Sequence, residues 1–98
     1  ELLKELAKSD PNHNVRVTAC DYIYKVSLEH NSDLIFIEGR LLSDHSELFK
    51  YELLKLFITY KWDISDLTLA SLLKESLEIN KLIFQIIYDS SIFLEKVF

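Results

Sequence analysis

One spacing occurs twice in this chain and restricts what it can fold into. Asp10 is followed by Val15-Arg16, and 34 residues later Asp44 is followed by Phe49-Lys50. In each copy a leucine-rich segment precedes the aspartate and an apolar segment follows the basic residue. Two helices joined by a short polar turn produce this pattern, so the chain is predicted to be built from repeated helical hairpins.

Apolar residues recur at helical spacing along the rest of the chain, and clusters of Ser, Asp, Asn and Pro separate the segments. The predicted hairpins cover about 1–30, 32–61 and 66–88, and residues 91–98 are predicted to begin a further helix. Residues 79–88 also fit a buried strand because they are rich in isoleucine. A lone strand would have no pairing partner, so we expect a helix there.

Local signals mark several helix starts and one weak point. Asn12 or Asn14 is placed to cap the second helix, and Ser32 and Ser65 are predicted N-caps for the third and fifth. Gly39 falls inside the third helix, where it is predicted to weaken the helix and to allow close packing.

The second helix has an apolar stripe that we expect to be buried. Its members are Val15, Ala19, Tyr22, Ile23 and Val26. Tyr24 faces away from this stripe, which predicts that its ring is exposed.

The repeated pattern resembles the HEAT repeat family. The matching residues in the first copy are Leu3, Leu6, Asp10, Val15, Arg16 and Ala19, while the second copy has Lys50 for the arginine and Leu53 for the alanine. The resemblance implies an all-α fold, a right-handed α-α superhelix of about three hairpins. It also implies that Asp10, Arg16, Asp44 and Lys50 are structural residues of a turn-and-ladder network between neighbouring hairpins. Proteins of this family are mostly scaffolds, adaptors, transport factors and regulatory subunits.

Composition indicates a single helical domain over residues 1–98. Hydrophobic residues make up 49% of the chain, and one Gly and one Pro leave little material for turns or linkers. Glu1 opens a chain that contains no Met. We therefore expect a processed chain or a fragment of a longer one.

Charge and cysteine content exclude several classes of partner. The net charge of −5 disfavours nucleic acid and an anionic membrane surface, because both require a basic stripe. No apolar run is long enough for a membrane span.

Cys20 is the single cysteine, so the chain has no internal disulfide. A reducing compartment follows, with the cytoplasm expected and the nucleus as the alternative.

No catalytic residue, cofactor or metal ligand is expected. One glycine cannot form a phosphate-binding loop, and the three histidines are isolated from one another in the sequence. Cys20 has no base beside it and is predicted to be a small buried residue. The chain is therefore predicted to be a non-catalytic protein-binding scaffold or adaptor.

The candidate partner-binding residues are a basic and aromatic set, because such side chains are enriched at protein interfaces: Arg16, Tyr24, Lys50, Tyr60 and Trp62. Residues 79–98 are apolar on most sides of their helix and are a predicted surface for self-association.

Two other interpretations remain open. Six or so short helices in this length also fit a death-fold-like adaptor, which would pack as a globule. The other is a DNA-repair enzyme with HEAT-like repeats. Such an enzyme would need a basic concave face, and the chain has 11 basic residues against 16 acidic ones.

Overall fold

The fold consists entirely of helices in the residues described, which are 2–73 and 75–97 of the computed structural model, with side chains described up to residue 89. Residues 79–88 are helical, as predicted. The helices are α1 (Leu2–Ser9), α2 (His13–Val26), α3 (His30–Ser43), α4 (Glu47–Tyr60), α5 (Asp66–Leu72) and α6 (Leu77–Val97).

Short polar side chains cap the helices at most of their starts. The side chain of Asn12 accepts a hydrogen bond from the backbone N–H of Asn14, and Ser65 Oγ accepts one from Thr68. The predicted cap at Ser32 is wrong, because α3 already begins at His30. The reason is the tight turn after α2, in which Ser27 Oγ accepts a hydrogen bond from the backbone N–H of Glu29 at 3.0 Å.

The third hairpin differs most from the sequence prediction. α5 ends at Leu72, and Ser76 Oγ accepts a hydrogen bond from the backbone N–H of Ile79 at 3.2 Å, which caps the next helix. The predicted break near Asp89 and the further helix at 91–98 are wrong, because α6 continues without interruption to Val97. Neither Gly nor Pro lies between 77 and 97, so nothing in the backbone chemistry stops the helix there.

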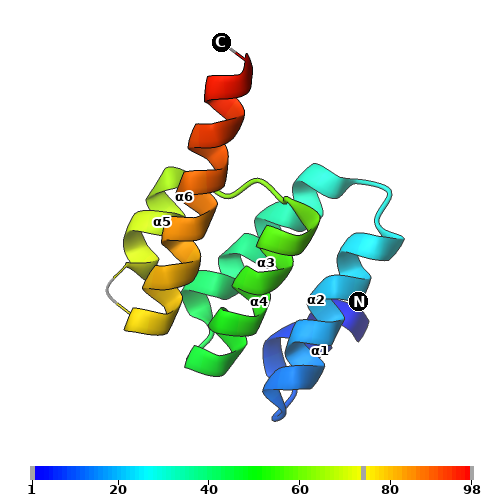
Figure 1. The fold of residues 1–98 in the computed structure, drawn as a ribbon. Helices are drawn as coiled ribbons and strands as arrows, with labels where there is room; N and C mark the ends of the chain where they lie inside the picture. The colour runs from blue at the N-terminus through cyan, green and yellow to red at the C-terminus, as the bar shows by residue number, and fades with distance from the viewer. Residues whose placement is uncertain (1, 74, 98) are drawn as a thin grey trace.

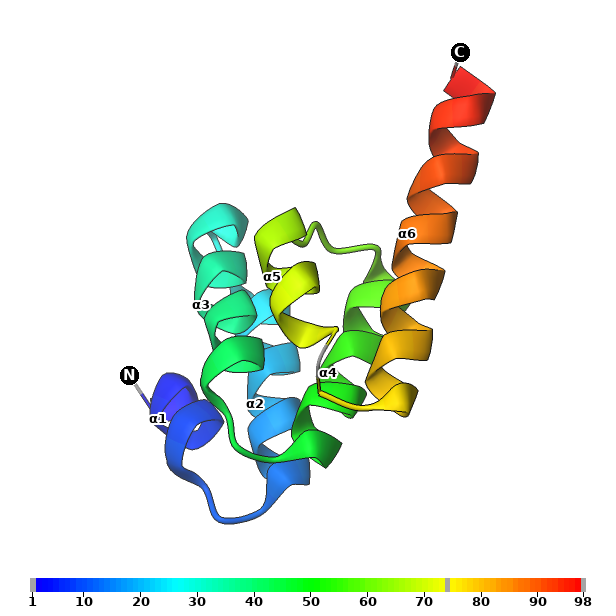
Figure 2. The ribbon, with the colours of Figure 1, turned by 90° about the vertical axis from the view of Figure 1, so that its left-hand side faces the viewer.

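The helices lie in two rows (Figure 1). α2, α4 and α6 pack side by side in one row, and α1, α3 and α5 pack against them as the second. The view toward the α5–α6 end shows the last part of α6 extending beyond its neighbours (Figure 2). Polar contacts join the second row as well, since Lys4 of α1 pairs with Asp33 of α3 at 3.5 Å.

The hydrophobic core lies between the two rows. Its buried members are Ala7, Ala19, Cys20, Ile23, Ile37, Leu41, Phe49, Leu53, Leu54, Phe57, Trp62, Leu69, Leu72, Ile79 and Ile83. The molecule measures 43 × 32 × 19 Å, and its shortest dimension matches two layers of helices of about 10 Å each. Within the described residues, no helix combines the length and apolarity needed to cross a bilayer.

Candidate functional site

Among the charged side chains that the structure describes, the most buried is the carboxylate of Asp44, in the turn between α3 and α4. Arg16 of α2 donates to both of its oxygens, from Nε to Oδ2 at 2.8 Å and from Nη2 to Oδ1 at 3.0 Å. Arg40 of α3 donates to Oδ2 at 3.2 Å, and the backbone N–H of Ser46 donates to Oδ1 at 2.9 Å. This bidentate arrangement links the first and second hairpins.

The electrostatics of Asp44 follow from these bonds. Burial by itself would raise the pKa of this carboxyl group. The hydrogen bonds from Arg16 and Ser46, together with the positive charges of Arg16 and Arg40, outweigh burial, so the pKa of Asp44 lies below its ordinary value. Asp44 is therefore a charged group that the fold stabilises.

A second ion pair of the same kind links the second and third hairpins. Lys50 of α4 binds the carboxylate of Glu75 in the turn before α6. Arg16 and Lys50 are each the fourth residue of their helices. Asp10, the first predicted turn residue, accepts a hydrogen bond from the backbone N–H of Asn12 at 2.9 Å, and its carbonyl oxygen accepts one from Arg16.

Arg16 and Lys50 were also predicted to contact a partner, and their burial argues against that role. Only 12% of the Arg16 side chain and 11% of the Lys50 side chain are exposed, and both are engaged in ion pairs. Cys20 is fully buried, and burial raises the pKa of its thiol to about 12. A thiol in this state is a poor nucleophile at neutral pH.

An aromatic cluster closes the opposite end of α2 and α4. The ring of Trp62 lies 4.7 Å from Tyr24, 5.2 Å from Phe57 and 5.2 Å from Tyr60, measured between centroids. His30 stacks on Tyr24 at 4.4 Å. Trp62, a candidate partner-binding residue, is buried, since only 6% of it is accessible. Its indole Nε1 is buried and has no hydrogen-bond partner among the described residues.

Tyr24 is half-buried against the same core, so its predicted exposure is wrong.

The prediction of a buried apolar stripe on α2 is only partly correct. Ala19 and Ile23 are buried, but Tyr22 and Val26 are exposed. The reason is that α2 packs against α1, α3 and α4 through different parts of its circumference, and a helical wheel does not show which part remains open.

Tyr60 is the one predicted binding residue that is clearly exposed, and it belongs to a larger patch. Lys25 Nζ lies 6.0 Å from the ring centroid of Tyr60 and 5.8 Å from that of Tyr22. A hydrogen bond to Asp21, 3.1 Å away, raises the pKa of Lys25. We call Tyr22, Lys25 and Tyr60 the tyrosine patch. Sequence reasoning missed Tyr22 because it was assigned to the buried stripe.

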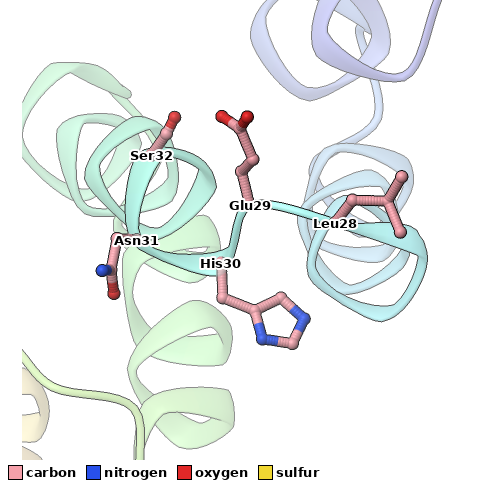
Figure 3. Close-up of a pocket in the computed structure, with 5 residues that line it drawn as sticks. All are labelled: Leu28, Glu29, His30, Asn31 and Ser32. Carbon is pink, nitrogen blue, oxygen red and sulfur yellow. The ribbon is translucent and has the colours of Figure 1, made fainter.

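Hollows on the surface of the described residues include two beside α2. One is an open pocket along the α2–α3 connection, lined by Leu28, Glu29, His30, Asn31 and Ser32. The side chains of Glu29 and His30 point to opposite sides of the chain there (Figure 3), so they do not converge on a common ligand. The other is a mostly apolar groove between α1 and α2, lined by Leu3, Leu6, Asn14, Val15, Thr18, Ala19 and Tyr22.

The outer side of α6 carries exposed apolar side chains over the part of the helix whose side chains are described. Phe84, Ile87 and Tyr88 are exposed there, whereas Ile79 and Ile83 face the core. The sequence predicts a helix that is apolar on most sides. In the structure, its described side chains form one buried apolar face and one exposed apolar face. Within the described residues no group of His, Cys, Asp and Glu side chains is arranged to hold a metal ion.

Comparison of this chain with protein-family models, with curated proteins and with solved structures found no match.

Proposed function

We propose that this chain is a non-catalytic, HEAT-like protein-binding scaffold or adaptor, a right-handed superhelix of three hairpins. The order of packing supports a stack, because α2 contacts α4 and α4 contacts α6. The two ion pairs support a repeat, because Arg16 and Lys50 occupy the same position in successive second helices and each binds an acid of the next hairpin. Repeat proteins of this kind bind partners along extended surfaces.

The same packing disfavours the death-fold-like alternative. In a globular six-helix bundle, the first and last helices share a core with the others. In the described part of this chain, α1 and α2 have no substantial packing with α5 or α6, and α3 and α4 separate the two hairpins. The net charge of −5 favours a protein partner over nucleic acid.

The tyrosine patch is the binding site that we propose. The observation that carries this proposal is that Tyr22 and Tyr60, exposed on neighbouring helices, are joined by Lys25 between their rings. Tyrosines bury a large area on binding and lose little conformational freedom, and lysine over an aromatic face adds electrostatic attraction. Trp62 stacks under Tyr60 and holds its ring in place.

Comparative affinity capture tests this function. Wild-type chain and the Tyr60→Ala variant are used in parallel on the same lysate, and Tyr88→Ala, an exposed tyrosine on α6, is the matched control. We expect at least one protein to be captured by wild type and Tyr88→Ala and to be reduced about tenfold with Tyr60→Ala. Calorimetry with that purified protein then measures a direct interaction. Identical capture by all three chains would contradict the tyrosine patch.

A further inference from the structure

Gly39 is the only glycine in the chain, and no contact within the fold requires it. It lies inside α3, where glycine destabilises a helix relative to alanine. Its φ is not positive, so its backbone conformation suits any residue, and a Cβ added there would meet no atom within 4 Å. Ser43 Oγ donates a hydrogen bond to its carbonyl oxygen at 2.7 Å, but that bond uses only the backbone. The glycine therefore leaves an unused space on the surface of α3.

Exposed apolar side chains stand on both sides of this space. Ile35, four residues before Gly39, is 73% exposed, and Leu42, three residues after it, is 49% exposed. Residues at these intervals share one face of a helix, and this face is turned away from Ile37 and Leu41, which are buried in the core. We call Ile35, Gly39 and Leu42 the α3 notch, because an apolar side chain lies at each end and none in the middle.

The α3 notch lies in the middle of the fold. α3 is placed between α1 and α5 in its row (Figure 2). It is held from both sides, since Lys4 of α1 pairs with Asp33 at 3.5 Å and Glu38 accepts the backbone N–H of Ser65, before α5, at 2.7 Å. A hairpin added to a stack packs against its first or last hairpin. The exposure of the α3 notch therefore does not depend on the length of the chain.

Acidic side chains lie along one edge of the notch. Glu38 precedes Gly39, and its hydrogen bond to Ser65 brings the loop before α5 alongside α3. Asp63 and Asp66, both exposed, are within two residues of Ser65. Among the described residues, none of these three carboxylates forms an ion pair with a base. A ligand with positive charges on this edge is therefore attracted, and one with negative charges is repelled.

We infer that the α3 notch binds an amphipathic helix of a partner protein that carries Lys or Arg along one edge. Apolar side chains of the partner pack against Ile35 and Leu42, and the missing side chain at Gly39 lets the two helices cross closely. A helix is the occupant because side chains three and four residues apart form ridges that fit the grooves of another helix. The basic edge faces Glu38. This surface is on the other row of helices from Tyr60, so it is a second interaction surface in addition to the tyrosine patch.

A second copy of this chain is a poorer occupant. The lysines Lys25, Lys55 and Lys81 are exposed on helices, but each pairs with an acid of its own helix, at 3.1, 3.6 and 3.6 Å. Their charges are therefore already compensated, and the net charge of −5 makes two copies repel each other.

The single glycine supplies a site-specific probe. Cell-free synthesis of the untagged chain with ¹⁵N-glycine gives one amide signal in a proton–nitrogen NMR spectrum, that of Gly39. The ligand used is a designed helical peptide of about 20 residues with leucines on one face and lysines along one edge, and a matched peptide has glutamate in place of each lysine. We expect the lysine peptide to shift the Gly39 signal to saturation, with a dissociation constant at least about tenfold lower than that of the glutamate peptide.

Substitutions then test the notch and its acidic edge, with binding of the lysine peptide measured by fluorescence anisotropy. Gly39→Gln fills the notch and should weaken binding at least about tenfold without lowering the melting temperature, because glutamine favours a helix more than glycine does. Thr59→Gln adds the same side chain at an exposed position of α4 and should bind as wild type does. Asp66→Asn should weaken binding about threefold, whereas Glu47→Gln, which also changes an exposed acid in the first turn of a helix, should leave it unchanged.

Three results with the peptides would overturn the inference. They are no shift of the Gly39 signal by the lysine peptide up to about 1 mM, equal binding of the lysine and glutamate peptides, and wild-type binding by Gly39→Gln. A Gly39 signal that moves with protein concentration in the absence of peptide would make a second copy the occupant and would also overturn it. None of these measurements involves Tyr60, so failure here is distinguishable from failure of the proposed function.

Discussion

The guanidinium of Arg16 binds both carboxylate oxygens of Asp44, 28 residues further along the chain. Arg40 binds the same carboxylate from α3 and also donates from Nε to the carbonyl oxygen of Ala7 in α1 at 3.3 Å. One acidic side chain in a turn therefore connects elements from two hairpins. Because Asp44 is almost fully buried, its charge depends on both arginines for compensation.

Removal of Asp44 is expected to be costly for this reason. Asp44→Ala leaves two arginines without their acceptor, and we expect the free energy of unfolding to fall by about 3 kcal/mol. Asp10→Ala removes only a turn hydrogen bond within the first hairpin and should cost about 1 kcal/mol. Urea denaturation measures both values. A double-mutant cycle between Arg16→Ala and Asp44→Ala should give a coupling of at least about 1 kcal/mol, and additive effects would show that the pair contributes nothing specific.

The lowered pKa of Asp44 predicts a particular pH dependence of stability. A carboxyl group whose pKa is lower in the folded state binds its proton more readily when unfolded, so its contribution is present above the ordinary value of 3.8 and is lost as the pH falls through the folded pKa. The difference in unfolding free energy between wild type and Asp44→Asn should therefore be largest near neutral pH and shrink below about pH 4. A constant difference down to pH 2 would contradict this account.

Cys20 is expected to be protected from thiol reagents in the folded chain. Its side chain is fully buried, and burial raises the pKa of the thiol to about 12, so very little thiolate exists at pH 8. Labelling with a maleimide should be at least about a hundredfold slower in the native chain than in urea, because it requires an opening of the fold. Equal rates under the two conditions would mean that α2 does not pack as described.

Replacing Gly39 is expected to increase the stability of the fold. It is exposed in α3, and a Cβ added there would meet no atom within 4 Å, so the predicted role in close packing is wrong. Gly39→Ala should raise the free energy of unfolding by about 0.5 to 1 kcal/mol through its higher helix propensity. The reverse change at an exposed alanine of α5, Ala70→Gly, is the matched control and should lower it. Destabilisation by Gly39→Ala would reveal a contact of α3 that this structure lacks.

Molecular size does not distinguish a stack of three hairpins from a compact bundle in this chain. The radius of gyration is 13.5 Å, close to the ~13 Å of a compact globule of this length. Three hairpins are too few for a stack to become elongated. The distinction between a stack and a bundle must therefore come from contacts between helices, such as the pairs Arg16–Asp44 and Lys50–Glu75.

Several parts of the site could be predicted from residues alone and others could not. Tyr60 was predicted as a surface residue and is exposed, but its neighbours Tyr22 and Lys25 were not recognised. Trp62 is also a candidate binding residue by its residue type, yet it packs into the aromatic cluster. The end of α4 explains this difference, since Lys61 adopts a left-handed conformation with φ of 56° that accompanies the turn of the chain back toward the core.

The sequence alone determined that the chain is helical, and it determined most helix starts, because an N-cap such as Asn12 or Ser65 acts within three residues of itself. It did not determine which side of α2 would remain exposed or that Glu75 would pair with Lys50. Those features depend on residues about 25 positions or more apart, and packing decides them. α6 shows the same division. Its own residues are enough to make it helical, but they do not decide which of its apolar faces is buried. Ile79 and Ile83 are buried and Phe84 is exposed because α4 and α5 cover one side of the helix.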